Sequence, residues 1–129
     1  MPAAQHLKVL VVDDTSVSRM LVSDGLNQIG IKNVTLAGDG EQALKSMMTA
    51  PCHIVISDFN MPKLDGIQLL KALREYPPTR QVGFILVTGR GDKALIDFAK
   101  KFGLNNYLPK PFTVPGLKTA IEAVVGKLT

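Results

Sequence analysis

Five short apolar runs alternate with amphipathic stretches along this chain, and this alternation limits the possible folds more than any other feature. The runs are Leu7–Val12, Val34–Ala37, His53–Ser57, Val82–Val87 and Asn106–Leu108. Three of these runs are rich in Val, Ile and Leu with little polar alternation, which is typical of strands that are covered on both faces. The stretches between and after the runs repeat apolar residues at helical spacing. The pattern therefore predicts five strand–helix units.

Strand–helix units joined by short links favour a parallel sheet with helices on both faces. Because crossovers between parallel strands are right-handed, few topologies remain. The favoured one is the α/β, flavodoxin-like (βα)5 fold, a doubly wound parallel sheet with strand order 2-1-3-4-5. With 129 residues, the chain is expected to form one domain over residues 1–129, with a core roughly from residue 7 to residue 128.

Local signals mark the helix ends. Asp39 and Asp65 each stand three residues before a Gln, a variant of the capping box that begins a helix. Gly30 and Gly103 are placed to end helices. Pro77-Pro78 stops the third helix. The first helix also contains a glycine at position 25, for which close packing against another helix is the expected reason.

Charge and composition argue against several classes of protein. The net charge is +4, but the 15 Lys and Arg residues are spread from Lys8 to Lys127 without an aromatic-interleaved cluster, so nucleic-acid binding is not expected. No apolar run reaches the ~18 residues of a membrane span, and the N-terminus lacks a signal design. Cys52 alone forms neither an internal disulfide nor a cysteine-based zinc site. We therefore expect a cytoplasmic protein that binds no membrane.

Polar residues follow four of the five predicted strands. Asp13 and Asp14 come after the first strand, and Asp58 comes after the third. Thr88 follows the fourth strand, and Lys110 follows the fifth. Ligands of open parallel sheets bind at the carboxyl ends of the strands, and the first and third strands are neighbours in the proposed order. The three carboxylates are therefore expected to lie together.

Each of these residues also has an ordinary structural interpretation. Asp14 or Thr15 can cap a helix, and Asp58 can start a turn. Thr88 can end a strand, and Lys110 can lie in solvent. Taken together the residues are harder to explain in this way, because three like charges at one sheet edge repel each other. A cation that needs all three carboxylates explains the grouping better.

Mg²⁺ is the cation that suits this set, because it prefers oxygen ligands and binds through one or two carboxylates. His6 and His53 lie at the opposite ends of their strands, so a zinc site is not expected. With Mg²⁺ present, a carboxylate can attack phosphorus and form an acyl phosphate. A lysine offsets charge on the transferring group, and a threonine hydroxyl can donate to a phosphoryl oxygen. The residues thus indicate phosphoryl transfer.

Five motifs carry a resemblance to a known family. They are Val11-Val12-Asp13-Asp14, Ser57-Asp58-Phe59-Asn60-Met61-Pro62, Asp65-Gly66, Val87-Thr88-Gly89 and Leu108-Pro109-Lys110-Pro111-Phe112. With these motifs in this order, the chain resembles the receiver domain of two-component response regulators from Leu7 to Leu128. Within that family it is most similar to the stand-alone chemotaxis regulators.

The resemblance implies a role for each site residue. Asp58 would be the phosphoacceptor, taking a phosphoryl group from the phosphohistidine of a sensor histidine kinase. Asp13 and Asp14 would hold Mg²⁺ together with Asp58 and the backbone carbonyl of Asn60. The domain is expected to assist its own phosphorylation and dephosphorylation, and it is not expected to be a turnover enzyme.

The resemblance also implies a switch. Thr88 and Lys110 would bind the phosphoryl oxygens, and Lys110-Pro111 is a candidate for a cis peptide bond, which X-Pro sequences tolerate. Tyr107 matches the aromatic residue that turns inward as Thr88 moves toward the phosphate. Phosphorylation adds about 1.5–2 negative charges, which would pull on Thr88 and Lys110. A movement of Thr88 would open space for the adjacent ring, so that two side-chain packings compete. If there is no switch, Tyr107 is simply a half-exposed aromatic residue on a strand.

The surface expected to report this change combines the fourth helix, the fifth strand and the fifth helix. Its candidate residues are Lys93, Lys100, Lys101, Tyr107 and Lys118, with Arg90 beside them. This basic face would receive an acidic or amphipathic partner segment, and the alternative is a solvated surface. We expect a monomer that controls flagellar motility through a flagellar switch protein. A phosphate sink and a phosphorelay intermediate are the alternatives.

One position departs from the family pattern. Two residues after Thr88 stands Arg90, where the best-known chemotaxis regulators carry Glu. Asn60, two residues after Asp58, matches them. The resemblance implies that both positions flank the water route to the acyl phosphate, so Asn60 and Arg90 are expected to tune dephosphorylation.

Two other functions share parts of this pattern. A haloacid-dehalogenase-type phosphatase also forms an aspartyl phosphate, but its second Asp would stand at position 15, which is Thr15 here. A flavin-binding module of the same fold would have to hold a phosphate beside Asp13 and Asp14, which would repel it. Both functions are kept as alternatives to a receiver domain.

Overall fold

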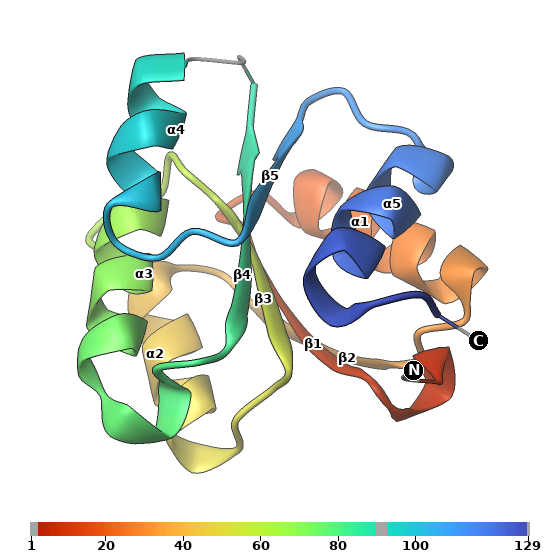
Figure 1. Ribbon diagram of the computed structural model, residues 1–129, viewed down its shortest axis with the longest axis horizontal. Coiled ribbons are helices and arrows are strands. Elements are labelled where there is room, and N and C mark those ends of the chain that lie inside the picture. Colours follow the sequence, from red (N-terminus) through yellow and green to blue (C-terminus); the bar gives the residue numbers. More distant parts are fainter. Residues whose placement is uncertain (1–2, 90–92, 129) are drawn as a thin grey trace.

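The sheet has the strand order that the sequence predicts. A computed structural model describes residues 3–89 and 93–128 (Figure 1). The strands are β1 (Lys8–Val12), β2 (Asn33–Ala37), β3 (Ile54–Asp58), β4 (Gly83–Thr88) and β5 (Asn106–Pro109). They form a parallel sheet in the order β2-β1-β3-β4-β5. The carboxyl ends of β1 and β3 are therefore neighbours.

Helices cover both faces of the sheet. They are α1 (Ser16–Ile29), α2 (Gly40–Thr49), α3 (Gly66–Glu75), α4 (Lys93–Lys100) and α5 (Val114–Val125), with short 3-10 turns at η1 (Ala4–His6) and η2 (Pro77–Thr79). Figure 1 shows α1 and α5 on one face and α2, α3 and α4 on the other. The doubly wound arrangement is thereby confirmed. Within residues 3–89 and 93–128, no helix combines the length and apolar composition that a membrane span needs.

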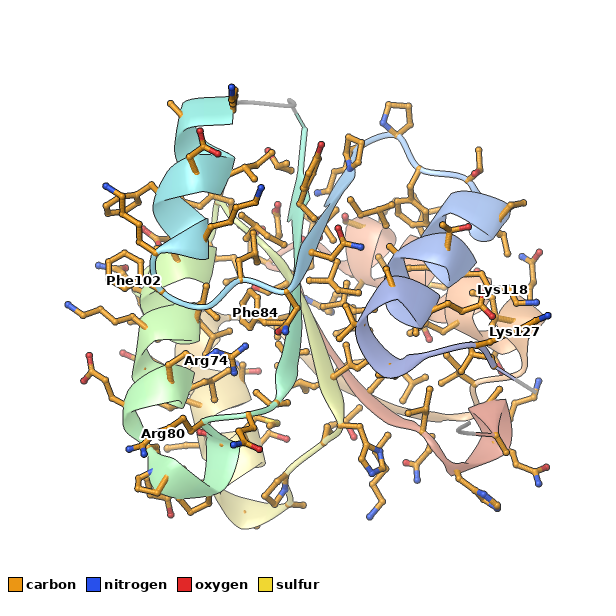
Figure 2. All side chains as sticks on the ribbon, viewed as in Figure 1. Arg74, Arg80, Phe84, Phe102, Lys118 and Lys127 are labelled. Atoms are coloured by element: carbon orange, nitrogen blue, oxygen red, sulfur yellow. The ribbon has the colours of Figure 1, made fainter. Side chains whose placement is uncertain are left out.

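Alternate residues of the central strands face two different cores. On β1, Val9 and Val11 pack against apolar residues of α1 and α5, whereas Leu10 and Val12 pack against those of α2 and α3. Because both faces are covered, such a strand needs an apolar residue at every position, which explains the continuous apolar runs in the sequence. Phe84 of β4 is fully buried in the core that lies between the sheet and the helices α2 and α3 (Figure 2).

The helix ends follow the sequence signals. Asp39 accepts a hydrogen bond at 2.8 Å from the N–H three residues further on. Asp65 and Gln68 form a complete capping box at the start of α3. Gly30 ends α1 in the left-handed region with φ 102°, and Gly103 has φ 88° in the turn after α4. These turns fix where each helix starts and stops relative to the sheet edge.

Gly25 lies where α1 packs on α5. A Cβ at this position would come within 2.9 Å of Leu117 Cδ2, and Leu117 is fully buried. The expected close packing is therefore confirmed. It brings α1 near the loop that leads into α5, which carries Lys110.

Candidate functional site

Three carboxylates meet at the carboxyl ends of β1 and β3. Asp13 and Asp14 form the turn between β1 and α1, and Asp58 is the last residue of β3. One oxygen from each carboxylate lies within 4.8 Å of the others. Asp13 is buried, Asp58 is half-buried and Asp14 is exposed. The grouping predicted from the strand order is thus present.

Lys110 reaches these carboxylates from the segment after β5. Its Nζ lies 3.4 Å from Asp58 Oδ1 and 3.7 Å from Asp13 Oδ2. It also donates to Ser18 Oγ on α1 at 3.4 Å. The Lys110-Pro111 peptide bond is cis, as the sequence indicated. One ammonium group therefore contacts two of the three carboxylates.

The Asp58 carboxyl is held in a defined position. Its Oδ1 accepts a hydrogen bond from the N–H of Phe59 at 2.9 Å, and its main-chain oxygen accepts one from Ser57 Oγ at 2.8 Å. Burial raises the pKa of the Asp58 carboxyl above its usual range. The carboxylate of Asp13 raises this pKa further, while Lys110 and the Phe59 N–H oppose the shift. On balance, the surroundings of Asp58 therefore disfavour its ionised form.

Thr88 lies at the same edge of the sheet. It is buried at the end of β4, and its carbonyl oxygen accepts a hydrogen bond from the Lys110 N–H at 2.7 Å. Tyr107 stands on β5 opposite Leu86 of β4, and its side chain is 38% exposed. Asn60 lies in the exposed loop after β3, two residues beyond Asp58. The structure thus places Thr88 and Lys110 together and Tyr107 on the adjoining strand.

The lysines predicted to form the output face are exposed. Lys93, Lys100 and Lys101 are exposed in or after α4, and Lys118 is exposed on α5. Figure 2 shows Lys118 near the edge of the molecule away from α4. Arg90, expected to tune dephosphorylation, falls outside the described residues.

Two residues assigned a structural role lie at the other end of the sheet. His53 Nδ1 accepts a hydrogen bond from the main-chain N–H of Lys8 at 3.0 Å, so it links the starts of β1 and β3. Cys52 is a free, half-buried thiol whose pKa is raised by burial. Neither residue reaches the carboxylates.

Three residues of α1 and its N-cap contact the site and were not predicted from the sequence. Thr15 begins α1 without capping it through its side chain; its N–H and hydroxyl both donate to Asp13 Oδ1, at 3.0 and 3.2 Å. Ser18 contacts Lys110, and Arg19 Nη1 donates to the Asp13 carbonyl at 2.6 Å. Their position places the first turn of α1 beside the acidic strand end, but it does not show which of these side chains reach Asp13 or Lys110.

The donor set fits Mg²⁺. The oxygens of Asp13, Asp14 and Asp58 are hard anionic ligands, and they lie within 4.8 Å of one another. Ligands at the usual Mg–O distance are separated by at most about 4.2 Å, so a slight inward movement lets all three contact one ion. The raised pKa of Asp58 points the same way, because a cation would relieve the repulsion from Asp13.

A cavity of about 590 Å³ opens beside Lys110, between α1 and the start of α5. Ser18 and Lys110 are among its polar lining residues, and Leu21, Phe112 and Val114 are among its apolar ones. Leu21 belongs to an exposed apolar group on α1, which also includes Val17 and Met20. A partly apolar surface therefore lies beside Lys110, which contacts Asp13 and Asp58.

Comparison with known proteins identifies the class. Residues 9–122 match the response regulator receiver domain family, and the chain belongs to this family. A relative named as a probable chemotaxis protein CheY, from Rhizobium etli, is 54% identical over 128 residues, which cover 99% of each chain. This chain is thus a CheY-like receiver domain.

Two solved structures are also similar. The activated, magnesium-bound NMR structure of the response regulator CheY2 from Sinorhizobium meliloti, formed with BeF3, is 53% identical, covers 100% of both chains and gives a TM-score of 0.75. The receiver domain of a sensor histidine kinase from Pseudomonas aeruginosa is 27% identical, with a TM-score of 0.84 over 94% of this chain and 98% of that one. It is described with a magnesium ion coordinated in its active site cleft.

Gly66→Ala is expected to distort the site. A Cβ at Gly66 would lie 2.5 Å from the main-chain oxygen of Asp58 and 2.8 Å from Leu86 Cδ1. Because backbone cannot give way as a flexible side chain can, we expect the free energy of unfolding to fall by about 2 kcal/mol. Urea unfolding measures this. Gly89→Ala is the control, since its Cβ would meet no described atom within 4 Å. Equal stability of the two variants would contradict the close approach.

Asp58→Asn is expected to stabilise the protein at neutral pH when Mg²⁺ is absent. The pKa of Asp58 is higher in the folded than in the unfolded chain, so its ionisation destabilises the fold. This cost is absent below the unfolded-state pKa and develops as the pH rises through the folded-state pKa. Urea unfolding at neutral pH and at about pH 4 should show the gain at neutral pH only. Asp97→Asn, at an exposed position on α4, is the control. A variant less stable than wild type at neutral pH would refute the sign.

Proposed function

We propose that this protein is a phosphoacceptor response regulator in which Asp58 receives a phosphoryl group from the phosphohistidine of a sensor histidine kinase. The observation that carries the proposal is the convergence of Asp13, Asp14 and Lys110 on the Asp58 carboxyl. A carboxylate oxygen of Asp58 attacks phosphorus and forms an O–P bond as the P–N bond to the donor histidine breaks. The imidazole leaving group then takes up a proton.

Each neighbouring group has a task in this transfer. Asp13, Asp14, Asp58 and the backbone carbonyl of Asn60 would hold Mg²⁺, which when bound supplies positive charge for the phosphoryl oxygens. Lys110 moves its ammonium from the carboxylates to a phosphoryl oxygen, and the Thr88 hydroxyl donates to another. Hydrolysis later returns the Asp58 carboxylate, so the domain assists its own phosphorylation and dephosphorylation and is not a turnover enzyme.

The kinase is expected to approach across α1. Val17, Met20 and Leu21 are 70%, 60% and 60% exposed, which is unusual for apolar side chains grouped on one helix. Leu21 lines the cavity that Lys110 also lines, and Val17 and Met20 lie on the same helix. A donor that covered this surface would exclude water while the phosphoryl group moves. The sequence predicts a cytoplasmic, single-domain protein. Both properties are compatible with a kinase partner, and both remain predictions.

The output is expected to be control of flagellar motility through a protein contact. The chemotaxis names of the relatives support this, as do the exposed residues of α4, β5 and α5. Tyr107 lies on the strand next to the one that ends at Thr88, so a movement of Thr88 can be followed by the ring. An acidic or amphipathic segment of a flagellar switch protein fits the lysines of α4.

Phosphorylation by acetyl phosphate tests the central step without the kinase. Wild type with MgCl2 should gain one phosphoryl group on Asp58, and Asp58→Asn should gain none, because its amide is not a nucleophile. Removal of Mg²⁺ should reduce the rate at least about 100-fold. Mass spectrometry of the intact protein and its peptides gives the readout. Asp97→Asn, remote from the site, should behave as wild type, and a phosphoryl group on Asp58→Asn would contradict the assignment.

Charge reversal tests the output face. Lys93→Glu should weaken binding of the phosphorylated protein to an acidic flagellar-switch peptide by about tenfold, because a rim charge that attracts the partner becomes repulsive. Lys118→Glu should weaken binding less, because Lys118 lies near the edge of the molecule away from α4 (Figure 2). Lys45→Glu, exposed on α2, is the matched control. Fluorescence titration gives the affinities. Unchanged affinity for Lys93→Glu would reject this face, and rapid return of the phosphoryl group to the kinase would favour a sink or a relay.

A further inference from the structure

Arg19 on α1 reaches back to the turn that carries two of the acidic side chains. Its Nη1 donates to the main-chain carbonyl oxygen of Asp13 at 2.6 Å. The same nitrogen lies 3.5 Å from where a Cβ of Gly38 would stand, in the turn after β2. The half-buried guanidinium therefore fills the space between the turns that follow β1 and β2.

The turn itself is fixed by few contacts. The Asp13 N–H donates to the Ala37 carbonyl at 3.1 Å, and Asp13 Oδ1 accepts from both the N–H and the hydroxyl of Thr15. These contacts hold Asp13, but they leave the next peptide group, between Asp13 and Asp14, to Arg19. Because a peptide group is planar, a hydrogen bond to its oxygen restricts the orientation of the whole plane and, with it, the direction in which Asp14 leaves the backbone.

Arg19 and Lys110 act on this site in different ways. Lys110 contacts carboxylate oxygens of Asp13 and Asp58, which are the oxygens that a metal ion needs. Arg19 contacts a carbonyl oxygen and leaves the carboxylates available. A charge-assisted hydrogen bond of this kind is short and directional. Arg19 can therefore stay in place when a cation arrives, whereas Lys110 must share or give up its partners.

We propose that Arg19 is a positioning residue for Mg²⁺ binding, which holds the Asp13–Asp14 peptide so that both side chains face Asp58. The inference rests on the proposed function, since it requires that Mg²⁺ binds these three carboxylates. Ordering the turn before the ion arrives lowers the entropic cost of binding. Hydrogen-bonding partners of metal ligands commonly act on affinity in this way.

Arg19→Lys separates position from charge. The variant keeps the positive charge but loses the planar fork and the reach to the carbonyl. We expect the Kd for Mg²⁺ to rise about tenfold, measured by titration calorimetry with MgCl2. Arg80→Lys is the matched control, because Arg80 is exposed and lies just before β4, at the opposite end of the sheet. Its Kd should equal that of wild type.

Arg19→Met adds a second comparison. It removes the hydrogen bond and also a positive charge that repels Mg²⁺, so at low salt its Kd should rise less than that of Arg19→Lys. In about 1 M KCl the charge is screened, and the two variants should then be equally weakened relative to wild type. A Kd within twofold of wild type for Arg19→Lys would overturn the inference. Failure of wild type itself to bind Mg²⁺ would instead overturn the proposed function.

A measurement on wild type covers the case in which Arg19→Lys does not fold. The Nη protons of Arg19 should exchange slowly with solvent in NMR spectra, both before and after MgCl2 is added, because the bond to the carbonyl persists. Loss of this protection on Mg²⁺ binding would overturn the inference, since Arg19 would then have released the turn.

Discussion

The repulsion among three carboxylates at one sheet edge is the constraint on which the rest of this structure depends. The strand order makes β1 and β3 neighbours, so that the ends of both strands deliver Asp13, Asp14 and Asp58 to one place. The ammonium group of Lys110 contacts Asp13 and Asp58 and partly compensates their charge, yet the pKa of Asp58 is still raised. A divalent ion bound by these carboxylates, as proposed above, would offset this repulsion.

Lys110 also links the site to the strands that would carry the signal. Its main-chain N–H is bonded to the Thr88 carbonyl, while its side chain lies between Asp13 and Asp58. A phosphoryl group on Asp58 would draw the ammonium and the Thr88 hydroxyl toward itself. Because β4 and β5 are paired at this end, such a pull acts directly on the strand that carries Tyr107. One hydrogen-bonded edge of the sheet therefore connects the carboxylates to the strand proposed to carry the output.

The fold and the main site residues could be predicted because they depend on the order of elements along the chain. Apolar runs without polar alternation indicated strands covered on both faces, and Asp13, Asp58 and Lys110 followed from what stands at the strand ends. The element bounds were less accurate, since β3 includes Asp58 and β5 extends to Pro109. Those extra residues are polar or are prolines, which a search for apolar runs passes over.

The supporting residues could not be predicted because they act through side-chain reach and close approach. Nothing in the spacing of Arg19 shows that its guanidinium turns back to the Asp13 carbonyl. Gly66 resembles any helix-start glycine until its distance from the Asp58 carbonyl is known. Lys118, grouped with the α4 lysines from sequence, lies near the edge of the molecule away from α4 (Figure 2). The roles of Arg19, Gly66 and Lys118 therefore become clear only from their positions in the three-dimensional structure.

The most direct test of the account is a Mg²⁺ titration followed through the side-chain carboxyl signals of Asp13, Asp14 and Asp58 in ¹³C NMR. If one ion is shared by the three groups, all three signals will move along a single binding curve with a common midpoint, while exposed Asp97 stays still. Three unrelated midpoints, or signals that do not move at all, would show that the carboxylates do not form one metal site.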